Sequence, residues 1–341
     1  MTQRPSLFDR LNQPIETELK RVVGNRKSPL YQMLRYHFGW IDQTGMPERH
    51  GGQERRLGTL CLAIAESASA ATERALPAAA AVELTQAFYT IHSELKEGKP
   101  DGAGRPALWW VWGHSQGINA GDGMYALARL AVMDLESRGI SAEVTASAAK
   151  LLDRACLELC EVQYRGIEAE AQETASPRQH LALIEGPIGS LYACAAQLAG
   201  LVAGVEGQHL DQLASYGRSI GVAGRLRADI DTFWGGRGDM AASLVDALDK
   251  RRSLPLLYAL ASSDAKVRDA FGAATRRENA LTDDEARRLL TILEESGARL
   301  QAEKSLSHYA SKASEALKQS GLPPSRLGDL REYAVYLSGV A

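Results

Sequence analysis

The sequence lacks several features that would assign it to a common class at once. Its 341 residues carry a formal net charge of −3, so the basic excess of a nucleic-acid-binding protein is missing and we expect no nucleic-acid partner. No stretch approaches about 18 consecutive apolar residues, so we expect no membrane span. The N-terminal segment MTQRPSLFDRLNQP contains no apolar run, which predicts no signal peptide and a cytoplasmic location.

Cysteine is also scarce, with four residues in the chain: Cys61, Cys156, Cys160 and Cys194. Each lies in a segment rich in alanine and leucine. Cys156 and Cys160 are four residues apart and would share a helix face, but no histidine accompanies them to complete a metal site. We therefore expect all four to be small buried side chains in a reducing compartment.

Strand patterns are hard to find. Runs of β-branched residues and alternation of apolar and polar residues are scarce, whereas apolar residues recur with a helical period along most of the chain. No repeat or low-complexity linker divides the sequence, so we expect one all-α domain over residues 1–341. The segment ETASP is placed to cap a helix that begins at Pro177. The expected helices span about residues 14–24, 28–38, 54–73, 77–97, 106–116, 119–138, 142–171, 177–203, 207–232, 241–248, 252–262, 265–276, 282–317 and 325–339.

One acidic pair stands out from this pattern. Glu94 and Glu97 end the apolar helix expected over residues 77–97, and a Gly-rich loop with almost no positive charge follows. Residues three apart lie on one face of a helix. Taken alone, the pair is explained as a solvated helix end whose charge is balanced by Lys96 and Lys99. A wider pattern in the sequence gives it a second interpretation.

Four segments occur in the order and spacing of the polyprenyl synthetases: ALPAAAAVELTQAFYTIH, GRPALWWVWGHSQGINAGDGMYALARLAV, YGRSIGVAGRLRADIDTFWG and KRRSLPLLYAL. The sequence resembles this family over about residues 20–270, and INAGDGMYALA is the most specific segment. The resemblance implies the class I isoprenoid synthase fold, a single large helical bundle around a central apolar cavity. It also implies a prenyl diphosphate substrate that loses pyrophosphate with the help of Mg²⁺, which acts as a Lewis acid on the leaving group.

The two aspartate-rich motifs of that family, both DDxxD, are altered here. The first falls on SELKE and keeps carboxylates at Glu94 and Glu97. The second falls on ADIDT and keeps Asp229, while Asp231, two residues on, is expected to point in a different direction. Mg²⁺ prefers oxygen ligands and takes a few carboxylates together with phosphate and water. The resemblance therefore implies a reduced Mg²⁺ site in which Glu94, Glu97 and Asp229 are the metal ligands and catalytic residues.

The groups that bind phosphate in the family are altered as well. The segment GGQERRLG retains Arg55 and Arg56 of an N-terminal basic motif, but has glutamine and glycine where lysine and proline are typical. Two arginines that usually follow the first acidic motif are replaced by glycine and alanine, while Arg105 just beyond is kept. A lysine of the family falls on Pro187. The resemblance implies that the substrate-binding residues are Arg55, Arg56, Tyr89, His92, Gln163, Arg225 and Arg251.

Two of these residues have alternative interpretations. His92 is either a structural histidine or a neutral base that removes a proton from a carbocation. Arg225, a new positive charge beside the second acidic motif, either binds a phosphate directly or pairs with Glu94 or Glu97 and closes the pocket. The second outcome would give a protein without ionising activity.

The retained apolar segments and the altered phosphate ligands leave three functions open. The first is a diverged enzyme that catalyses terpene cyclisation or a non-standard prenyl transfer. The second is a catalytically inactive homologue that acts as the partner subunit of an active prenyl diphosphate synthase. The third is a prenyl-lipid binding protein. The resemblance implies a homodimer, or a heterodimer with a related synthase. We favour the first function because carboxylates remain at both expected helix ends.

Overall fold

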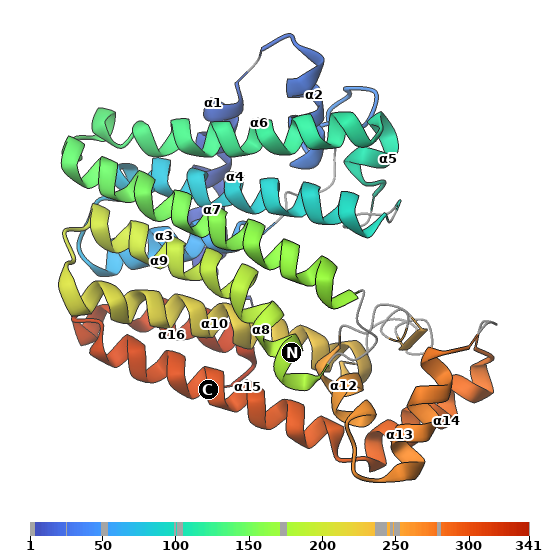
Figure 1. The fold of residues 1–341 in the computed structure, drawn as a ribbon. Helices are drawn as coiled ribbons and strands as arrows, with labels where there is room; N and C mark the ends of the chain where they lie inside the picture. The colour runs from blue at the N-terminus through green and yellow to red at the C-terminus, as the bar shows by residue number, and fades with distance from the viewer. Residues whose placement is uncertain are drawn as a thin grey trace.

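The computed structural model describes residues 4–24, 26–48, 54–98, 100, 105–170, 176–235, 244–245, 248, 253–277 and 281–340. Within these ranges the chain is mostly helical, and its β structure is limited to isolated bridges such as the one between Ile41 and Pro47. The all-α fold expected from the sequence is confirmed (Figure 1).

A π-helical turn over Glu185–Gly189 joins α8 to α9 without a loop. The described α-helices are α1 (Ser6–Val23), α2 (Pro29–His37), α3 (Arg56–Ser67), α4 (Thr72–Glu97), α5 (Leu108–Trp112), α6 (His114–Met133), α7 (Ala142–Glu170), α8 (Pro177–Ile184), α9 (Ser190–Val202), α10 (Gly207–Trp234), α12 (Leu254–Leu260), α13 (Ala265–Thr275), α14 (Asp283–Glu295), α15 (Ala298–Gln319) and α16 (Gly328–Ser338).

Glycines with positive φ set two helix breaks that the sequence pattern placed differently. Gly113, with φ of 87°, separates α5 from α6 before the break expected after residue 116. Gly297, with φ of 75°, separates α14 from α15, so the single helix expected over residues 282–317 is wrong. A backbone with positive φ cannot continue a right-handed helix, so the helix ends there. Glycine adopts this conformation readily, whereas a residue with a side chain rarely does.

Other expected boundaries agree more closely with the structure. Ser176 caps α8: its hydroxyl accepts a hydrogen bond from the backbone N–H of Gln179 at 3.2 Å, and the Gln179 side chain accepts one in return from the Ser176 N–H. This arrangement confirms the cap expected from ETASP. The helix expected over residues 241–248 lies mostly outside the described residues.

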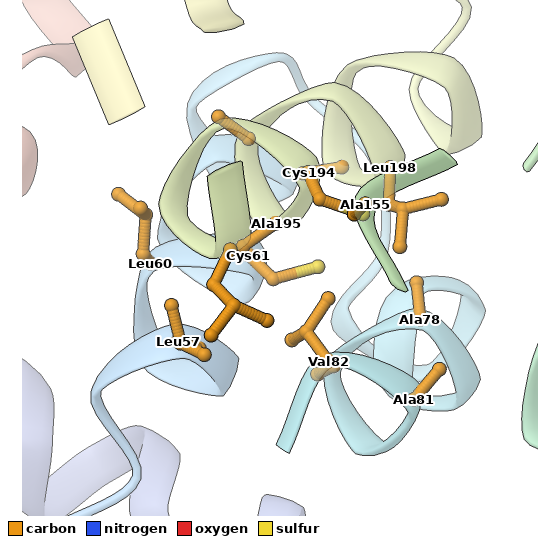
Figure 2. Packing of buried hydrophobic residues seen from close by; sticks show 14 of the residues in the cluster. Leu57, Leu60, Cys61, Ala78, Ala81, Val82, Ala155, Cys194, Ala195 and Leu198 are labelled. Atoms are coloured by element: carbon orange, nitrogen blue, oxygen red, sulfur yellow. The ribbon is translucent and has the colours of Figure 1, made fainter. Parts of the chain in front are cut away.

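The central core forms where α3, α4, α7 and α9 meet. Helix α9 packs against both α4 and α10, and α10 also packs against α15 and α16. Figure 2 shows Ala78, Ala81 and Val82 of α4 facing Cys61 of α3 and Cys194 of α9. These side chains are small and almost fully buried, so the helices approach closely and backbone and short side chains fill this part of the core.

The cysteines differ in exposure. Cys61, Cys156 and Cys194 are buried free thiols, and burial raises the pKa of both Cys61 and Cys156 to about 12. Cys160 lies on the outer side of α7 and is exposed, so the expectation that all four are buried is wrong at this position. Thiols with pKa values this high stay protonated at neutral pH, which suits a packing role for the buried residues.

Helices α9 and α10 are in unusually close contact at two glycines. A Cβ atom at Gly217 would collide with the backbone oxygen of Tyr192, and one at Gly221 would lie 2.6 Å from the Tyr192 ring. Only a residue without a side chain allows this approach. Tyr192 is thereby held between the two helices.

The C-terminal ends of α4, α7 and α10 lie at the same end of the bundle, on the right in Figure 1. A second, smaller apolar cluster lies at that end and includes Phe233 of α10, Leu256 of α12, Phe271 of α13 and Leu293 of α14. The helix ends that carry the two acidic segments are thus brought to one side of the molecule.

One helical stretch, Pro177–Val202, is long and apolar enough to cross a membrane by length and composition alone. However, 61% of its most apolar window is buried inside the protein. Core helices of soluble proteins meet the same criterion, so this stretch is weak evidence for a span.

Candidate active site

The first acidic pair lies at the C-terminal end of α4, where Gly98 stops the helix with φ of 64°. Glu94 is partly buried, and this burial raises its pKa. The nearby Arg105 guanidinium acts in the opposite direction, while the negative charge of Glu97 adds to the rise. Glu94 therefore lies within electrostatic reach of both a cation and a second carboxylate, which is an arrangement able to hold a divalent ion or a phosphate.

Arg105 also belongs to this site. The sequence pattern showed it to be retained, but it was not among the predicted substrate-binding residues. Its guanidinium donates to the backbone oxygen of His37, pairs with Glu48 at 3.4 Å and lies 4.7 Å from the ring centroid of Tyr36. These contacts fix a mostly buried positive charge beside Glu94. The sequence feature that could have predicted this role is the position of Arg105 soon after the acidic segment SELKE.

The structure brings Gln163 to the acidic end of α4. The Gln163 amide, on α7, donates to the hydroxyl of Ser93 at 3.1 Å. Lys96, on the same turn, directs its ammonium towards Gly166 of α7. One face of this helix end is thus bound to α7, and Glu94 on another face is left near Arg105.

His92 is directed towards α6. Its Nε2 lies 3.4 Å from the backbone oxygen of Ile118 and 3.8 Å from a carboxylate oxygen of Asp122. Its ring packs edge-on against Phe88 at 4.8 Å, and Gly121 provides the space for it. These contacts favour the structural interpretation of His92. Tyr89 is partly buried and packs against the main core.

The second acidic segment is organised differently. Asp229 is 5% exposed, and its carboxylate meets the side chains of His180 and Arg225 and the backbone N–H of Leu254. His180, from α8, is a residue that sequence reasoning missed, because no local pattern links it to α10. Asp231 pairs instead with Arg227 at 2.7 Å, so the two aspartates point in different directions as expected.

Arg225 does not pair with Glu94 or Glu97, which was one of the two alternatives for this residue. Its ion pair is with Asp229, one turn further along α10, at 3.0 Å. A helix-internal pair of this kind places the guanidinium next to its own carboxylate. That alternative is therefore wrong for the described structure, and the phosphate-binding alternative remains.

The two N-terminal arginines have different surroundings. Arg55 is 3% exposed, pairs with Glu16 at 2.5 Å and lies 4.8 Å from the ring centroid of Phe38. Arg56 is half exposed and pairs with Glu54 at 2.7 Å. Of the two, Arg56 is the one that a phosphate can reach. Arg251, the last predicted substrate-binding residue, lies outside the described residues.

The donor sets at the two helix ends differ in how well they fit Mg²⁺. In the part of the chain that the structure describes, no three His, Cys, Asp or Glu side chains gather as a metal site. Glu94 and Glu97 share one helix face and can supply carboxylate oxygens, which leaves the remaining positions to phosphate and water. Asp229 is already surrounded by N–H donors.

A helical bundle with acidic helix ends gathered at one side agrees with the fold implied by the sequence resemblance, and comparison with known proteins identifies the class. The family model of polyprenyl synthetases matches residues 46–293. The chain belongs to the polyprenyl synthetase family.

Individual relatives point the same way. The chain is 26% identical to a (2E,6E)-farnesyl diphosphate synthase of Mycobacterium bovis, over 99% of this chain and 94% of that protein. It is 25% identical to a geranylgeranyl diphosphate synthase of Mycobacterium tuberculosis, over 86% of this chain and 82% of that protein. A crystal structure of a polyprenyl synthetase from Streptomyces coelicolor superposes with a TM-score of 0.88 at 26% identity, covering 97% of this chain and 98% of that one.

Proposed function

We propose that the protein is an enzyme that binds a prenyl diphosphate and catalyses terpene cyclisation or a non-standard prenyl transfer through an altered diphosphate site. The observation that supports this most is the partly buried Glu94 beside Arg105 at the end of α4. A carboxylate and a fixed cation at the end of an apolar bundle are suited to hold an ionic head group while the hydrocarbon tail lies inside. Family membership supplies the substrate class.

Each residue has a distinct role in this proposal. Glu94 and Glu97 would hold Mg²⁺, which when bound neutralises the leaving pyrophosphate as a Lewis acid. Arg56, exposed at the start of α3, would bind a phosphate oxygen. Gln163 holds the end of α4 in place through Ser93. The small apolar side chains of the core exclude water from the allylic group, since water would quench a carbocation.

The test measures pyrophosphate release from C15 and C20 allylic diphosphates in the presence of Mg²⁺. We expect release by the native protein and a loss of about 100-fold in Glu94→Gln, because the amide cannot neutralise a metal ion. Glu73→Gln is the matched control, since Glu73 is an exposed acid in the first turn of the same helix. Equal release by Glu94→Gln and the control would contradict the metal assignment.

A second function is favoured by two observations. The enclosed Asp229 weakens the second metal position, and α6 and α7 expose apolar side chains that a partner would cover. The protein would then be a catalytically inactive partner subunit in the cytoplasm, paired with an active prenyl diphosphate synthase, whereas the enzyme would be a homodimer. Absence of release with any metal, together with co-purification of a second synthase, would establish this function over the first.

A further inference from the structure

The side chain of Asp229 joins three helices at one end of the bundle. Its Oδ1 accepts a hydrogen bond from Nε of Arg225 at 3.0 Å, and its Oδ2 lies 3.3 Å from Nε2 of His180 in α8. The backbone N–H of Leu254, at the start of α12, also donates to Oδ2 at 3.3 Å. Because a carboxylate only accepts hydrogen bonds, the Nε2 atom of His180 carries the proton in this contact.

These surroundings do not fit Mg²⁺. The ion requires near-octahedral oxygen ligands at about 2.0–2.1 Å, usually carboxylates, phosphates and water. Here both oxygens of Asp229 already face N–H donors, and the Arg225 donor carries a positive charge that would repel a metal ion. Asp229 is 5% exposed and His180 is 6% exposed, so a metal with its waters has little room.

The same cluster presents a positive group one helix turn before Asp229, the carboxylate kept from the second acidic motif. The described hydrogen bonds of Arg225 use only its Nε atom, and 43% of its side chain is exposed. Its terminal N–H groups are therefore available to an anion. A planar guanidinium forms paired hydrogen bonds with phosphate oxygens and keeps its charge at every relevant pH.

We propose that the α10 end of the site binds the diphosphate directly through Arg225, without a metal, and that Asp229 and His180 position this guanidinium. The Mg²⁺ ion is then confined to the side of Glu94 and Glu97. This inference rests on the proposed function for the identity of the substrate, but the interaction itself is with the diphosphate group alone.

The first experiment measures the affinity of inorganic pyrophosphate by calorimetry in buffer with EDTA. We expect binding by the native protein and a loss of about tenfold in Arg225→Gln, which corresponds to about 1.4 kcal/mol. We expect a smaller loss in Arg225→Lys, which keeps the charge but not the paired donors. Arg227→Gln is the matched control. Arg227 has the same spacing to its carboxylate and similar exposure, but lies towards Gly339 at the end of α16. Its affinity should equal that of the native protein.

The second experiment counts Mn²⁺ ions bound per chain, by electron paramagnetic resonance in the presence of pyrophosphate. We expect Asp229→Asn to leave the count unchanged and Glu94→Gln to lower it. A lower count in Asp229→Asn would make Asp229 a metal ligand and overturn the inference, as would pyrophosphate binding that requires metal or is indifferent to Arg225. The Arg225 and Arg227 variants decide the question even if Asp229→Asn does not fold, because they alter partly exposed side chains.

These outcomes are separate from the fate of the proposed function. A protein that binds inorganic pyrophosphate through Arg225 but neither binds nor turns over prenyl diphosphates would retain this inference and refute the proposed function. Conversely, the proposed function would be supported and this inference refuted if the native protein released pyrophosphate from an allylic diphosphate while Asp229→Asn and Glu94→Gln lost the same number of bound Mn²⁺ ions.

Discussion

Charged residues are buried where the N-terminal helices meet α4. Arg55 pairs with Glu16, whose other oxygen accepts a hydrogen bond from the indole of Trp40 at 2.7 Å. Glu83 accepts one from the backbone N–H of Gly58 at 2.8 Å. Buried pairs add little net stability, but removing one partner is costly because it leaves a charge without compensation. Arg55 is thus explained by its structural role in the fold.

Glu83 gives the protein a pH dependence that can be measured. Burial raises its pKa above the ordinary value of 4.5, with Arg55 and the Gly58 N–H acting in the opposite direction. For an acid with a raised pKa, the stabilising contribution is present below the ordinary value and is lost as the pH rises through the value in the folded state. We expect Glu83→Gln to match the native protein in urea unfolding at about pH 4 and to exceed its stability at about pH 8.

The amide of the Glu83→Gln variant keeps an oxygen to accept the Gly58 N–H, so the comparison isolates the charge. Glu83→Ala, which removes the acceptor, should be less stable than the native protein at both pH values, by about 1–3 kcal/mol. If the urea midpoint of Glu83→Gln were below that of the native protein at every pH, the carboxylate charge of Glu83 would be shown to stabilise the fold.

At the scale of helices, the α9–α10 contact depends on the absence of side chains. We expect Gly217→Ala to lower the free energy of unfolding by about 1–3 kcal/mol, because the new methyl group would collide with the backbone of Tyr192. The measurement is urea denaturation followed by circular dichroism. Gly224→Ala, on the same helix, is the control, since its Cβ would lie 3.4 Å from Leu337, an ordinary contact. It should be neutral or stabilising by up to about 1 kcal/mol, because alanine favours helix.

The positions of the long helices could be predicted from the sequence, but whether a given glycine lies inside a helix or ends one could not. The apolar period predicted α4, α7 and α10 closely, because long helices with one buried face carry a strong signal. Gly121 and Gly217 lie inside helices, while Gly113 and Gly297 end them. Composition alone does not separate these cases, since the difference depends on whether a neighbouring helix needs the space.

The candidate site was predictable only in part, for a related reason. Glu94 and Glu97 could be found because their spacing lies within one helix turn. The contacts of Asp229 with His180 and Leu254 join residues far apart in the chain, and a single sequence carries no record of such pairs. The same holds for Arg55, whose partner Glu16 lies on another helix.

At the scale of the whole molecule, α6 and α7 expose an apolar face. The large apolar side chains that are exposed on these two helices are Ile118, Leu130, Met133, Leu157, Tyr164 and Ile167. A hollow of about 540 Å³ opens between these helices, and it is lined by Met133 and Leu157 together with charged side chains of α7: Lys150, Asp153 and Arg154. Exposed apolar side chains gathered on neighbouring helices are often covered in a protein–protein interface. The proposed dimer, or the pairing with a related synthase, would cover it.

Leu157→Glu tests this surface, because Leu157 is 60% exposed and lies in the hollow. In size-exclusion chromatography with light scattering, we expect the native protein to elute as the proposed dimer and the variant to elute as a monomer. A charge buried without a partner in an interface strongly opposes association. Leu300→Glu is the control, since Leu300 is 55% exposed on α15. A dimer in both variants would place the interface elsewhere.

The alanines of α4 have one more consequence. Ala78 and Ala81 are fully buried near the start of the helix, while Glu94 and Glu97 stand at its far end. A change of charge at the far end leaves the tightly packed seam untouched, and a larger side chain in the seam would disturb folding before it altered any ligand. One helix thus combines a tightly packed first part with a terminal turn whose charges can change without disturbing that packing.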